Sequence, residues 1–355
     1  MQYFLFFAFT FVFSYLINGL FVKFSGTMGT KNNKGTGTVI RWGSVAKPAF
    51  GGISFYIVFL VSFALYTSFF AEEAVIQSFF GVLIASSLGF LIGLADDAYN
   101  TRPLLKFLGQ VACGLILVFT DNCINIFDSV LLNQAVTVFW VIGMMNSINM
   151  LDNMDAITTL VSIGVIIGAL LILAFEGACN HFYFWLLTGV LASLLGFLRF
   201  NWHPSKMYMG DTGSQFLGVF LAAIGIYFFW NDFSNTSDGL FASVMLPLLM
   251  FLPSIVDTTI VVINRLSKKQ SPFIGGKDHT AHHLSYMGLK DDKVAIVFLL
   301  FSLFSVAVAL LVNNYLKDWT GVVKLATLLY CLIVFAVLFW ITKVKKEKKN
   351  KISYI

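Results

Sequence analysis

Acidic and amide side chains are concentrated in three short segments of an otherwise apolar chain. The segments are GLADD at residues 93–97, NSINMLDNMD at 146–155 and MGDTGS at 209–214. Hard oxygen ligands of this kind suit Mg²⁺ or hydroxyl-rich substrates. A fourth segment, DHTAHH at 278–283, adds imidazoles, which can bind metal, move protons or contact phosphate. Together the four segments predict one site for ionic chemistry.

Two of the segments have features suited to phosphate and metal. The adjacent carboxylates of Asp96 and Asp97 repel each other, and a divalent cation or a bound cationic group would relieve that repulsion. In the 209–214 segment, glycines allow close backbone approach, free N–H groups at a helix start attract phosphate, and Asp211 adds a metal-binding carboxylate. The structural alternatives are a solvated helix end for the aspartate pair and a plain helix cap for the glycine-rich segment.

Four polar residues of the second segment repeat at a spacing of three. They are Asn146, Asn149, Asp152 and Asp155. On a helix such positions lie on nearly one face, so we predict a polar stripe that continues past the end of the apolar run. The alternative is a cap made by Asp155 for the following helix, but it leaves the two asparagines inside the apolar run unexplained.

The polar residues nearer the C-terminus are less specific. His279, His282 and His283 could grip a pyrophosphate together with the lysine that precedes them, although a surface histidine cluster is also compatible with simple solvation. Asp257 lies in an apolar run, with Arg265 on a similar face eight residues later. It is either functional or a polar contact to a neighbouring helix.

The composition indicates a polytopic membrane protein. The chain is 58% hydrophobic and 12% charged, whereas soluble domains carry about 25% charged residues. Its apolar runs are long enough to cross a bilayer as helices, which excludes the shorter alternating strands of a barrel. The four cysteines are scattered and are assigned to packing. The net charge of +5 comes from loops and a tail, so it indicates orientation in the membrane rather than nucleic-acid binding.

We predict an all-α protein of about eleven transmembrane helices, with a single transmembrane domain over residues 1–355 and a basic cytoplasmic tail at 344–355. Breakers and apolar runs place the spans near 3–22, 50–70, 76–94, 104–120, 131–148, 157–175, 182–199, 214–230, 240–263, 293–313 and 321–343.

The charges predict the orientation of these spans. The basic tail places the C-terminus in the cytoplasm, and an odd number of spans then places the N-terminus outside. With the spans oriented in this way, basic residues gather in the inner loops and acidic residues in the outer loops. The segments around 96, 152, 211 and 282 then all fall on the cytoplasmic face, although the orientation does not depend on them.

In this order, the segments resemble the polyprenyl-phosphate N-acetylhexosamine-1-phosphate transferase family (glycosyltransferase family 4), which includes phospho-N-acetylmuramoyl-pentapeptide transferase. The resemblance runs from Lys47 to about Gly288. It rests on KPAFGGI at 47–53, on Asp96-Asp97 with Lys106 and Gln110, on the N-x-x-N-x-x-D-x-x-D pattern of 146–155, on residues 201–214, and on Pro253, Asp257, Thr258 and Arg265.

The chain departs from the family pattern in places. Asn153 and Ala156 replace two glycines, and only His282 and His283 align as the histidine pair, with His279 displaced. The triple-histidine Phe-Glu signature of the muramyl-pentapeptide branch is absent. The resemblance is therefore nearer to the branch that uses UDP-N-acetylglucosamine or a related UDP-sugar.

The resemblance implies a multi-pass enzyme of the bacterial inner (cell) membrane with a cytoplasmic active site. It would transfer N-acetylhexosamine-1-phosphate, most simply GlcNAc-1-phosphate, from a UDP-sugar to undecaprenyl phosphate, releasing UMP as cell-envelope polysaccharide synthesis begins. The implied cofactor is Mg²⁺, with Mn²⁺ as a substitute. Membrane lipid and, at family level, a second copy of the chain are the implied partners, and nucleic acid is not.

The resemblance also implies roles for individual residues. The catalytic residues would be Asp96, Asp97 and Asp211, with Asp211 and Asp97 as metal ligands. The substrate-binding residues would be Lys106, Asn146, Asn149, Asp152, Asp155, His282 and His283. The alternatives are phospho-MurNAc-pentapeptide transferase activity, a membrane transporter, or an inactive relative that binds lipid-linked sugar.

Overall fold

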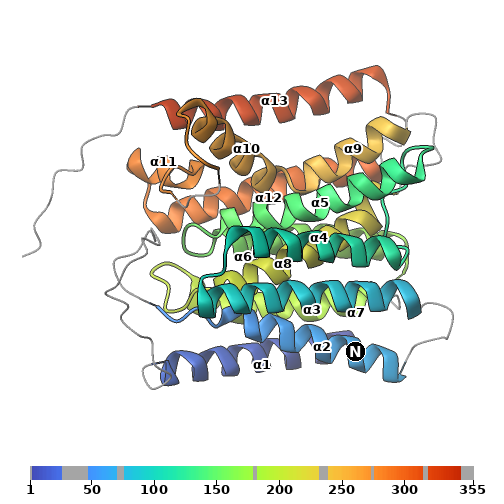
Figure 1. Ribbon diagram of the computed structural model, residues 1–355, viewed down its shortest axis with the longest axis vertical. Helices are drawn as coiled ribbons and strands as arrows, with labels where there is room; N and C mark the ends of the chain where they lie inside the picture. The colour runs from blue at the N-terminus through green and yellow to red at the C-terminus, as the bar shows by residue number, and fades with distance from the viewer. Residues whose placement is uncertain are drawn as a thin grey trace, which may run out of the picture.

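The computed structural model describes residues 2–25, 47–69, 76–178, 182–231, 239–272, 276–314 and 319–344. Within these ranges every regular element is a helix, and most of the helices run side by side in one bundle (Figure 1). The helices are α1 (Gln2–Phe24), α2 (Gly51–Phe69), α3 (Ile76–Tyr99), α4 (Pro103–Phe119), α5 (Val130–Leu151), α6 (Ile157–Phe175), α7 (Phe182–Asn201), α8 (Gly210–Gly225), the π-helical η2 (Ile226–Trp230), α9 (Gly239–Met250), α10 (Leu252–Ser267), α11 (Thr280–Tyr286), α12 (Asp291–Asn314) and α13 (Gly321–Lys343).

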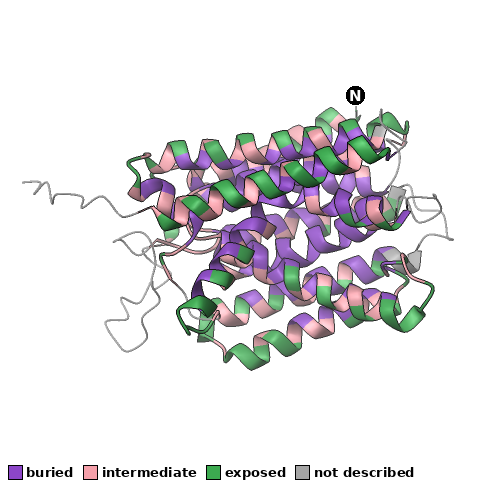
Figure 2. Cartoon of the chain, turned by 90° about the horizontal axis from the view of Figure 1, so that it is seen from above, coloured by how far each residue is buried: buried purple, intermediate pink, exposed green. Residues whose placement is uncertain are grey.

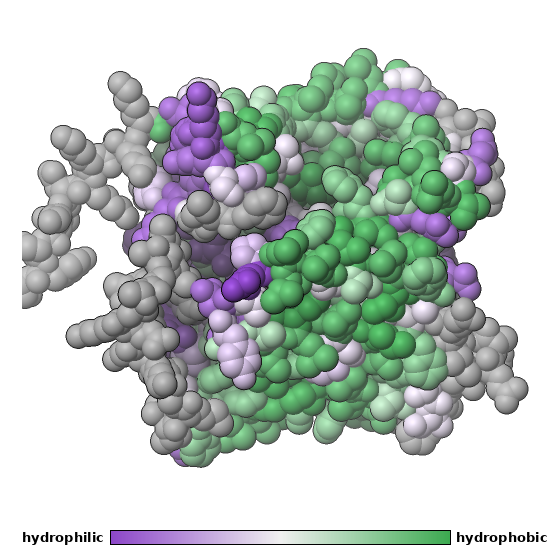
Figure 3. All heavy atoms as spheres, in the orientation of Figure 1, coloured by the Kyte–Doolittle hydropathy of each residue, from purple (hydrophilic) through white to green (hydrophobic). Residues whose placement is uncertain are grey.

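The all-α, polytopic fold class predicted from composition is confirmed. In the described part of the chain, nine helical segments are long and apolar enough to cross a membrane, and the bent pair of α9 and α10 makes a tenth. The shorter apolar helix α4, with 17 residues, corresponds to the remaining predicted span. Hydrophobic residues cover most of the face seen in Figure 3, and hydrophilic residues gather toward its two ends.

One predicted span is wrong in shape. Residues 240–263 were expected to form a single helix, but α9 and α10 meet at a bend of 85°. Phe251 separates them, Pro247 lies inside α9 and Pro253 lies in the first turn of α10. Because proline lacks an N–H and its ring clashes with the preceding turn, a straight helix through this segment is disfavoured. Both halves are rich in apolar residues, so hydropathy alone does not reveal the break.

Part of the predicted charge pattern lies outside the described residues. This holds for the basic tail from residue 345 onward and for the charged loop positions within 26–46, 70–75, 232–238 and 315–318. The placement of the N-terminus outside and the C-terminus in the cytoplasm therefore stays a prediction.

Helix α8 forms the centre of the bundle. Every residue of α8 except Asp211 is buried, and the helix packs against α2, α3 and α5. Figure 2 shows the same concentration of buried residues in the middle of the molecule. A helix that is apolar on all sides is expected to lie in a core. Asp211, in the first turn, is therefore the one residue of α8 that is not buried.

Two glycines allow the neighbouring helices to reach that first turn. A Cβ atom on Gly93 of α3 would lie 2.1 Å from the carbonyl oxygen of Asp211. A Cβ atom on Gly52 of α2 would lie 2.2 Å from the amide nitrogen of Gly213. Only glycine permits backbones to approach this closely. The start of α8 is therefore held between α2 and α3.

The C-terminus of α10 ends in a Schellman motif. The Gln270 N–H donates to the Arg265 carbonyl at 2.9 Å, and the Lys269 N–H donates to the Leu266 carbonyl at 2.9 Å. Lys269 occupies the position that is usually glycine and has a φ of 56°. This backbone conformation costs an L-residue about 1–2 kcal/mol.

We expect Lys269→Gly to raise the free energy of unfolding by about 1 kcal/mol, because glycine removes that strain at an exposed position and its added chain entropy offsets only part of the gain. Lys268→Gly is the matched control, since Lys268 has a φ of −95° and no strain to remove. Thermal unfolding in detergent compares the two variants. A Lys269→Gly protein no more stable than Lys268→Gly would contradict the prediction.

Candidate active site

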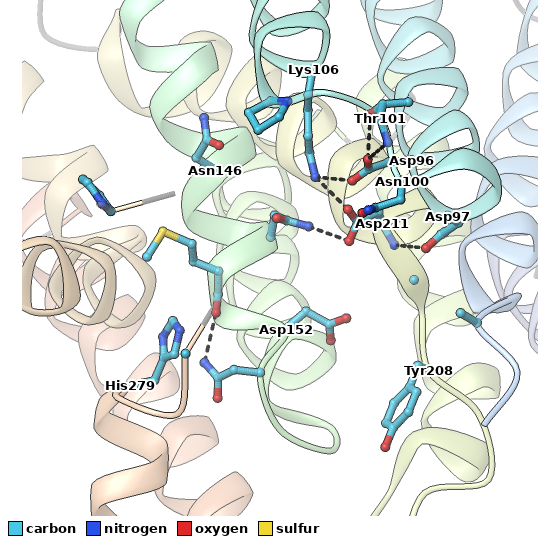
Figure 4. Close-up of a pocket in the computed structure, with 18 of the residues that line it drawn as sticks. Asp96, Asp97, Asn100, Thr101, Lys106, Asn146, Asp152, Tyr208, Asp211 and His279 are labelled. Carbon is cyan, nitrogen blue, oxygen red and sulfur yellow. Dashed lines mark hydrogen bonds and ion pairs between the residues drawn. The ribbon is translucent and has the colours of Figure 1, made fainter. Parts of the chain in front are cut away.

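The four polar segments meet in one cavity of about 460 Å³ at an end of the bundle. Nine of the ten predicted site residues line it; they are Asp96, Asp97, Lys106, Asn146, Asn149, Asp152, Asp155, Asp211 and His282. Figure 4 labels Asp96, Asp97, Lys106, Asn146, Asp152 and Asp211 among them. The tenth, His283, is not among the lining residues, and its ring lies 5.6 Å from that of Tyr286. His279, which the sequence pattern set aside, lines the cavity instead.

Lys106 is clasped between two carboxylates. Its Nζ donates to Oδ2 of Asp211 at 2.7 Å and to Oδ2 of Asp96 at 2.9 Å. Lys106 stands in the first turns of α4, Asp96 near the end of α3 and Asp211 at the start of α8, so three helix ends converge (Figure 4). The repulsion between Asp96 and Asp211 is thus relieved by a cation of the chain itself.

Asp96 is also fixed by the turn that follows α3. Its Oδ1 accepts hydrogen bonds from the Thr101 N–H at 2.9 Å and from the Thr101 hydroxyl at 2.6 Å. Thr101 lines the cavity and was not predicted as a site residue. A threonine a few residues after an aspartate at a helix end is the local signal that identifies such a turn.

Asp97 caps the start of α8. Its Oδ1 accepts from the Asp211 N–H at 3.0 Å, and its Oδ2 accepts from the Thr212 N–H at 2.9 Å and the Thr212 hydroxyl at 2.7 Å. A carboxylate is favoured there by the unpaired N–H groups and the helix dipole. The N–H groups predicted to attract phosphate at this helix start therefore include two that donate to Asp97. This arrangement gives Asp97 a positioning task.

The two asparagines of α5 pair with polar residues of α4 and α8. The Asn149 amide donates to Oδ1 of Asp211 at 3.0 Å and to the Ser214 hydroxyl at 2.8 Å. The Asn146 amide donates to Gln110 at 2.8 Å, and Gln110 donates to Gln215 at 3.1 Å. Polar side chains within apolar helices need such partners. The bond from Asn149 holds Oδ1 of Asp211, the oxygen that Lys106 does not contact.

The predicted polar stripe ends with its helix. α5 stops at Leu151, and Asp155 lies beyond the stop. The Asp155 carboxylate accepts from the Ser205 hydroxyl at 2.7 Å and the Ser205 N–H at 3.0 Å, and lies 2.9 Å from Nδ1 of His203. It thus holds the loop between α7 and α8 and does not cap α6, whose N-cap residue is Ala156 and which has no side-chain cap. His203 and Ser205 were not predicted.

The opposite wall is built by α10 and the segment before α11. Asp257 is fully buried and accepts hydrogen bonds from the N–H and the hydroxyl of Thr280, and its Oδ2 lies 2.8 Å from Nδ1 of His279. Arg265 donates two hydrogen bonds to Asp278, at 2.8 and 2.9 Å. Burial opposes the charge of Asp278, but these bonds outweigh it and hold the pKa of that carboxyl below its usual value. Both charged residues of α10 thus orient one segment.

His282 is buried in this wall. Burial lowers the pKa of its imidazole to about 4, and a positive charge on His279 adds to the effect. The distance between the two rings is 5.5 Å. We therefore expect His282 to be uncharged at neutral pH and to act as a neutral hydrogen-bonding group.

This lowered pKa predicts a specific loss of stability in acid. As the pH falls from about 6.5 to about 4, the unfolded chain binds a proton at His282 that the folded chain does not, and stability falls by up to about 3 kcal/mol. Above pH 7 the residue contributes no pH dependence. Thermal unfolding from pH 8 to pH 4.5 should show a smaller acid loss for His282→Gln than for the wild type. Parallel curves for the two proteins would contradict the prediction.

One carboxylate of the cavity is suited to hold Mg²⁺. Within the described ranges there is no group of three or more histidine, cysteine, aspartate or glutamate residues arranged to hold a metal ion. Mg²⁺ is commonly held by one or two carboxylates, with waters and substrate phosphates completing the shell. The half-buried Asp211 carboxylate fits that pattern. Asp97 fits it less well, because its oxygens accept two backbone N–H bonds and one hydroxyl bond that fix the start of α8.

Comparison with known proteins adds independent information. Residues 79–229 match Glycosyl transferase family 4. The chain is 30% identical over 277 residues to the probable undecaprenyl-phosphate N-acetylglucosaminyl 1-phosphate transferase of Bacillus subtilis, covering 74% of this chain and 73% of the relative. It is 28% identical to the phospho-N-acetylmuramoyl-pentapeptide-transferase of Carboxydothermus hydrogenoformans, covering 74% and 83%. It is 24% identical to the decaprenyl-phosphate N-acetylglucosaminephosphotransferase of Mycolicibacterium smegmatis, covering 62% and 59%.

Proposed function

This chain belongs to glycosyl transferase family 4, and we propose that it transfers N-acetylglucosamine 1-phosphate from UDP-N-acetylglucosamine to undecaprenyl phosphate, releasing UMP. The observation that carries the proposal is the convergence of Asp96, Lys106 and Asp211 from three helix ends in one cavity of a membrane protein. A water-soluble nucleotide and a membrane-bound phosphate can meet at such a place. The product would begin a cell-envelope polysaccharide.

The reaction joins two anions, so it depends on charge neutralisation and alignment more than on covalent catalysis. An oxygen of the lipid phosphate would attack the phosphorus that bears the sugar, and the bond from that phosphorus to the bridging oxygen of UMP would break. Lys106 would place its positive charge on the pyrophosphate. When bound at Asp211, Mg²⁺ would supply further positive charge to the breaking pyrophosphate.

The other lining residues would orient the two substrates. Asp96, held by Thr101, would align the lipid phosphate or take its proton. Asn149 would keep the Asp211 carboxylate in register, and Asp97 would hold the helix start that carries Asp211. Asp152 would bind the sugar nucleotide, and the wall that contains His282 would contact its phosphates.

The setting completes the proposal. The relatives come from bacteria, which supports a bacterial cell membrane. The cavity would face the cytoplasm, where UDP-sugars are made. The basic tail from residue 345 agrees with that orientation. A homodimer stays a prediction.

The test is UMP release by the purified protein with UDP-N-acetylglucosamine, undecaprenyl phosphate and Mg²⁺. We expect release that requires the lipid and stops when a chelator is added. Replacing the donor with UDP-MurNAc-pentapeptide tests the second candidate, which similarity to the Carboxydothermus relative favours. UMP release from that donor alone would make UDP-MurNAc-pentapeptide the assigned donor. No release from either donor would overturn the proposal.

A further inference from the structure

Lys106 occupies the place that a divalent cation would need. Its ammonium lies 2.7 Å from Oδ2 of Asp211, and the other Asp211 oxygen accepts from Asn149 at 3.0 Å. The Lys106 side chain is largely buried, with 17% of its surface exposed. The carboxylate suited to hold Mg²⁺ is therefore engaged on both oxygens.

We propose that Lys106 acts as an internal cation that keeps Mg²⁺ from Asp211 until the donor pyrophosphate draws its ammonium away, so that metal and sugar nucleotide bind cooperatively. This inference rests on the proposed function, because it takes the donor to be a nucleoside diphosphate sugar. It adds an order to the assembly of the site, in which metal alone binds weakly.

The electrostatics of the cluster support this order. Asp96, Lys106 and Asp211 together carry a net charge of −1, so half of the negative charge that would attract a free divalent ion is already neutralised. An ion placed on the same Asp211 oxygen would also lie within a few ångströms of the ammonium, and like charges at that distance repel strongly in a partly buried site. Metal binding without a new partner for Lys106 is therefore unfavourable.

A pyrophosphate would draw the Lys106 ammonium away from Asp211 and would add negative charge for the metal. Its oxygens offer Lys106 a new anionic partner, and they offer the metal ligands beyond Asp211. The donor therefore raises the affinity of the site for metal, and the metal must raise the affinity for the donor by the same factor.

Two other carboxylates of the cavity, Asp97 and Asp155, do not provide a ready substitute for Asp211. Asp97 accepts three hydrogen bonds from the start of α8, and Asp155 is held by His203 and Ser205. Moving either one would release the structure that it fixes. The position of Lys106 on Asp211 therefore controls access to the best metal ligand.

The experiment uses Mn²⁺ as a spectroscopic probe and follows free Mn²⁺ by electron paramagnetic resonance in detergent. We expect the wild type to bind Mn²⁺ at least about 10-fold more tightly with saturating UDP-N-acetylglucosamine than without it. A protein-free titration corrects for Mn²⁺ bound by the donor in solution. Equilibrium dialysis of labelled donor, with and without Mn²⁺, should give the same factor.

Two variants isolate the lysine. Lys106→Met should bind Mn²⁺ alone more tightly than the wild type, and the donor should then improve that affinity by less than about 3-fold. Lys106→Arg keeps the charge and should preserve the coupling. Lys290→Met is the matched control, because it removes an equal charge from an exposed position. It should match the wild type.

Each outcome decides a separate point. Equal Mn²⁺ affinity of the wild type with and without donor would overturn the inference, and so would a folded Lys106→Met protein that keeps the full coupling. Equal affinities in the wild type would overturn the inference even if Lys106→Met fails to fold, and Lys106→Arg then tests whether the charge of the side chain carries the coupling. Absence of donor binding in every condition would instead overturn the proposed function.

Discussion

Asp211→Asn is expected to lower the rate of UMP release by at least about 100-fold. The substitution keeps the size of the side chain but removes the charge that would hold the metal, and it deprives Lys106 of its nearer partner at 2.7 Å. Mn²⁺ binding in the presence of donor should be lost together with activity. The rate is measured in the UMP assay at saturating lipid.

Two comparisons make this expectation specific. Asp128→Asn changes an exposed aspartate in the connection between α4 and α5, at the other end of these helices from the cavity, and should keep the wild-type rate. Thermal unfolding of Asp211→Asn should stay near that of the wild type, which separates lost chemistry from lost structure. A stable Asp211→Asn protein with more than a tenth of the wild-type activity would show that Asp211 is not the metal ligand.

Asp257→Ala is expected to lower the free energy of unfolding by about 3–5 kcal/mol, the largest effect on stability that we predict. Asp257 is fully buried, and its carboxylate binds His279 and both the N–H and the hydroxyl of Thr280. Alanine would leave these groups buried without an acceptor. The measurement is the thermal or denaturant midpoint in detergent.

The size of the effect should follow the number of lost partners. Asp257→Asn keeps an acceptor oxygen and should cost less than alanine. Ser254→Ala lies on the same buried face of α10 and removes one hydrogen bond to the backbone of Phe251, so about 1 kcal/mol is expected. Hydrogen exchange should show early loss of protection in α11 of the Asp257 variants. A cost for Asp257→Ala as small as that of Ser254→Ala would contradict the prediction.

Much of the helix arrangement could be predicted because a bilayer imposes strong constraints on sequence. Apolar length predicted 157–175 and 321–343, and α6 and α13 have these bounds. The predicted span 214–230 begins too late, since α8 starts at Gly210, with a φ of 75°. The polar first turn of α8 is hidden from a hydropathy argument, because its stability comes from Asp97 on another helix.

Most residues that line the cavity could also be predicted, but the hydrogen bonds between them could not. Polar residues in a lipid-embedded chain must gather, so the segments around Asp96, Asn149 and Asp211 were expected to meet. Residue spacing does not say which donor reaches which acceptor across 105 positions, as between Lys106 and Asp211. The histidines illustrate the same limit, because the phase of α11 is set by the buried Asp257, and this directs His279 rather than His283 toward the cavity.

The cap that α3 places on α8 has a consequence for biosynthesis. Asp97 belongs to the third helix and its donors to the eighth, so five further helices must follow α3 out of the ribosome before the two meet. Membrane chains of this kind are built from the N-terminus onward. A nascent chain shorter than 210 residues carries Asp96, Asp97 and Lys106 without their common partner. The reactive centre therefore cannot form on a partly synthesised chain, and the enzyme becomes competent only after most of its bundle is in place.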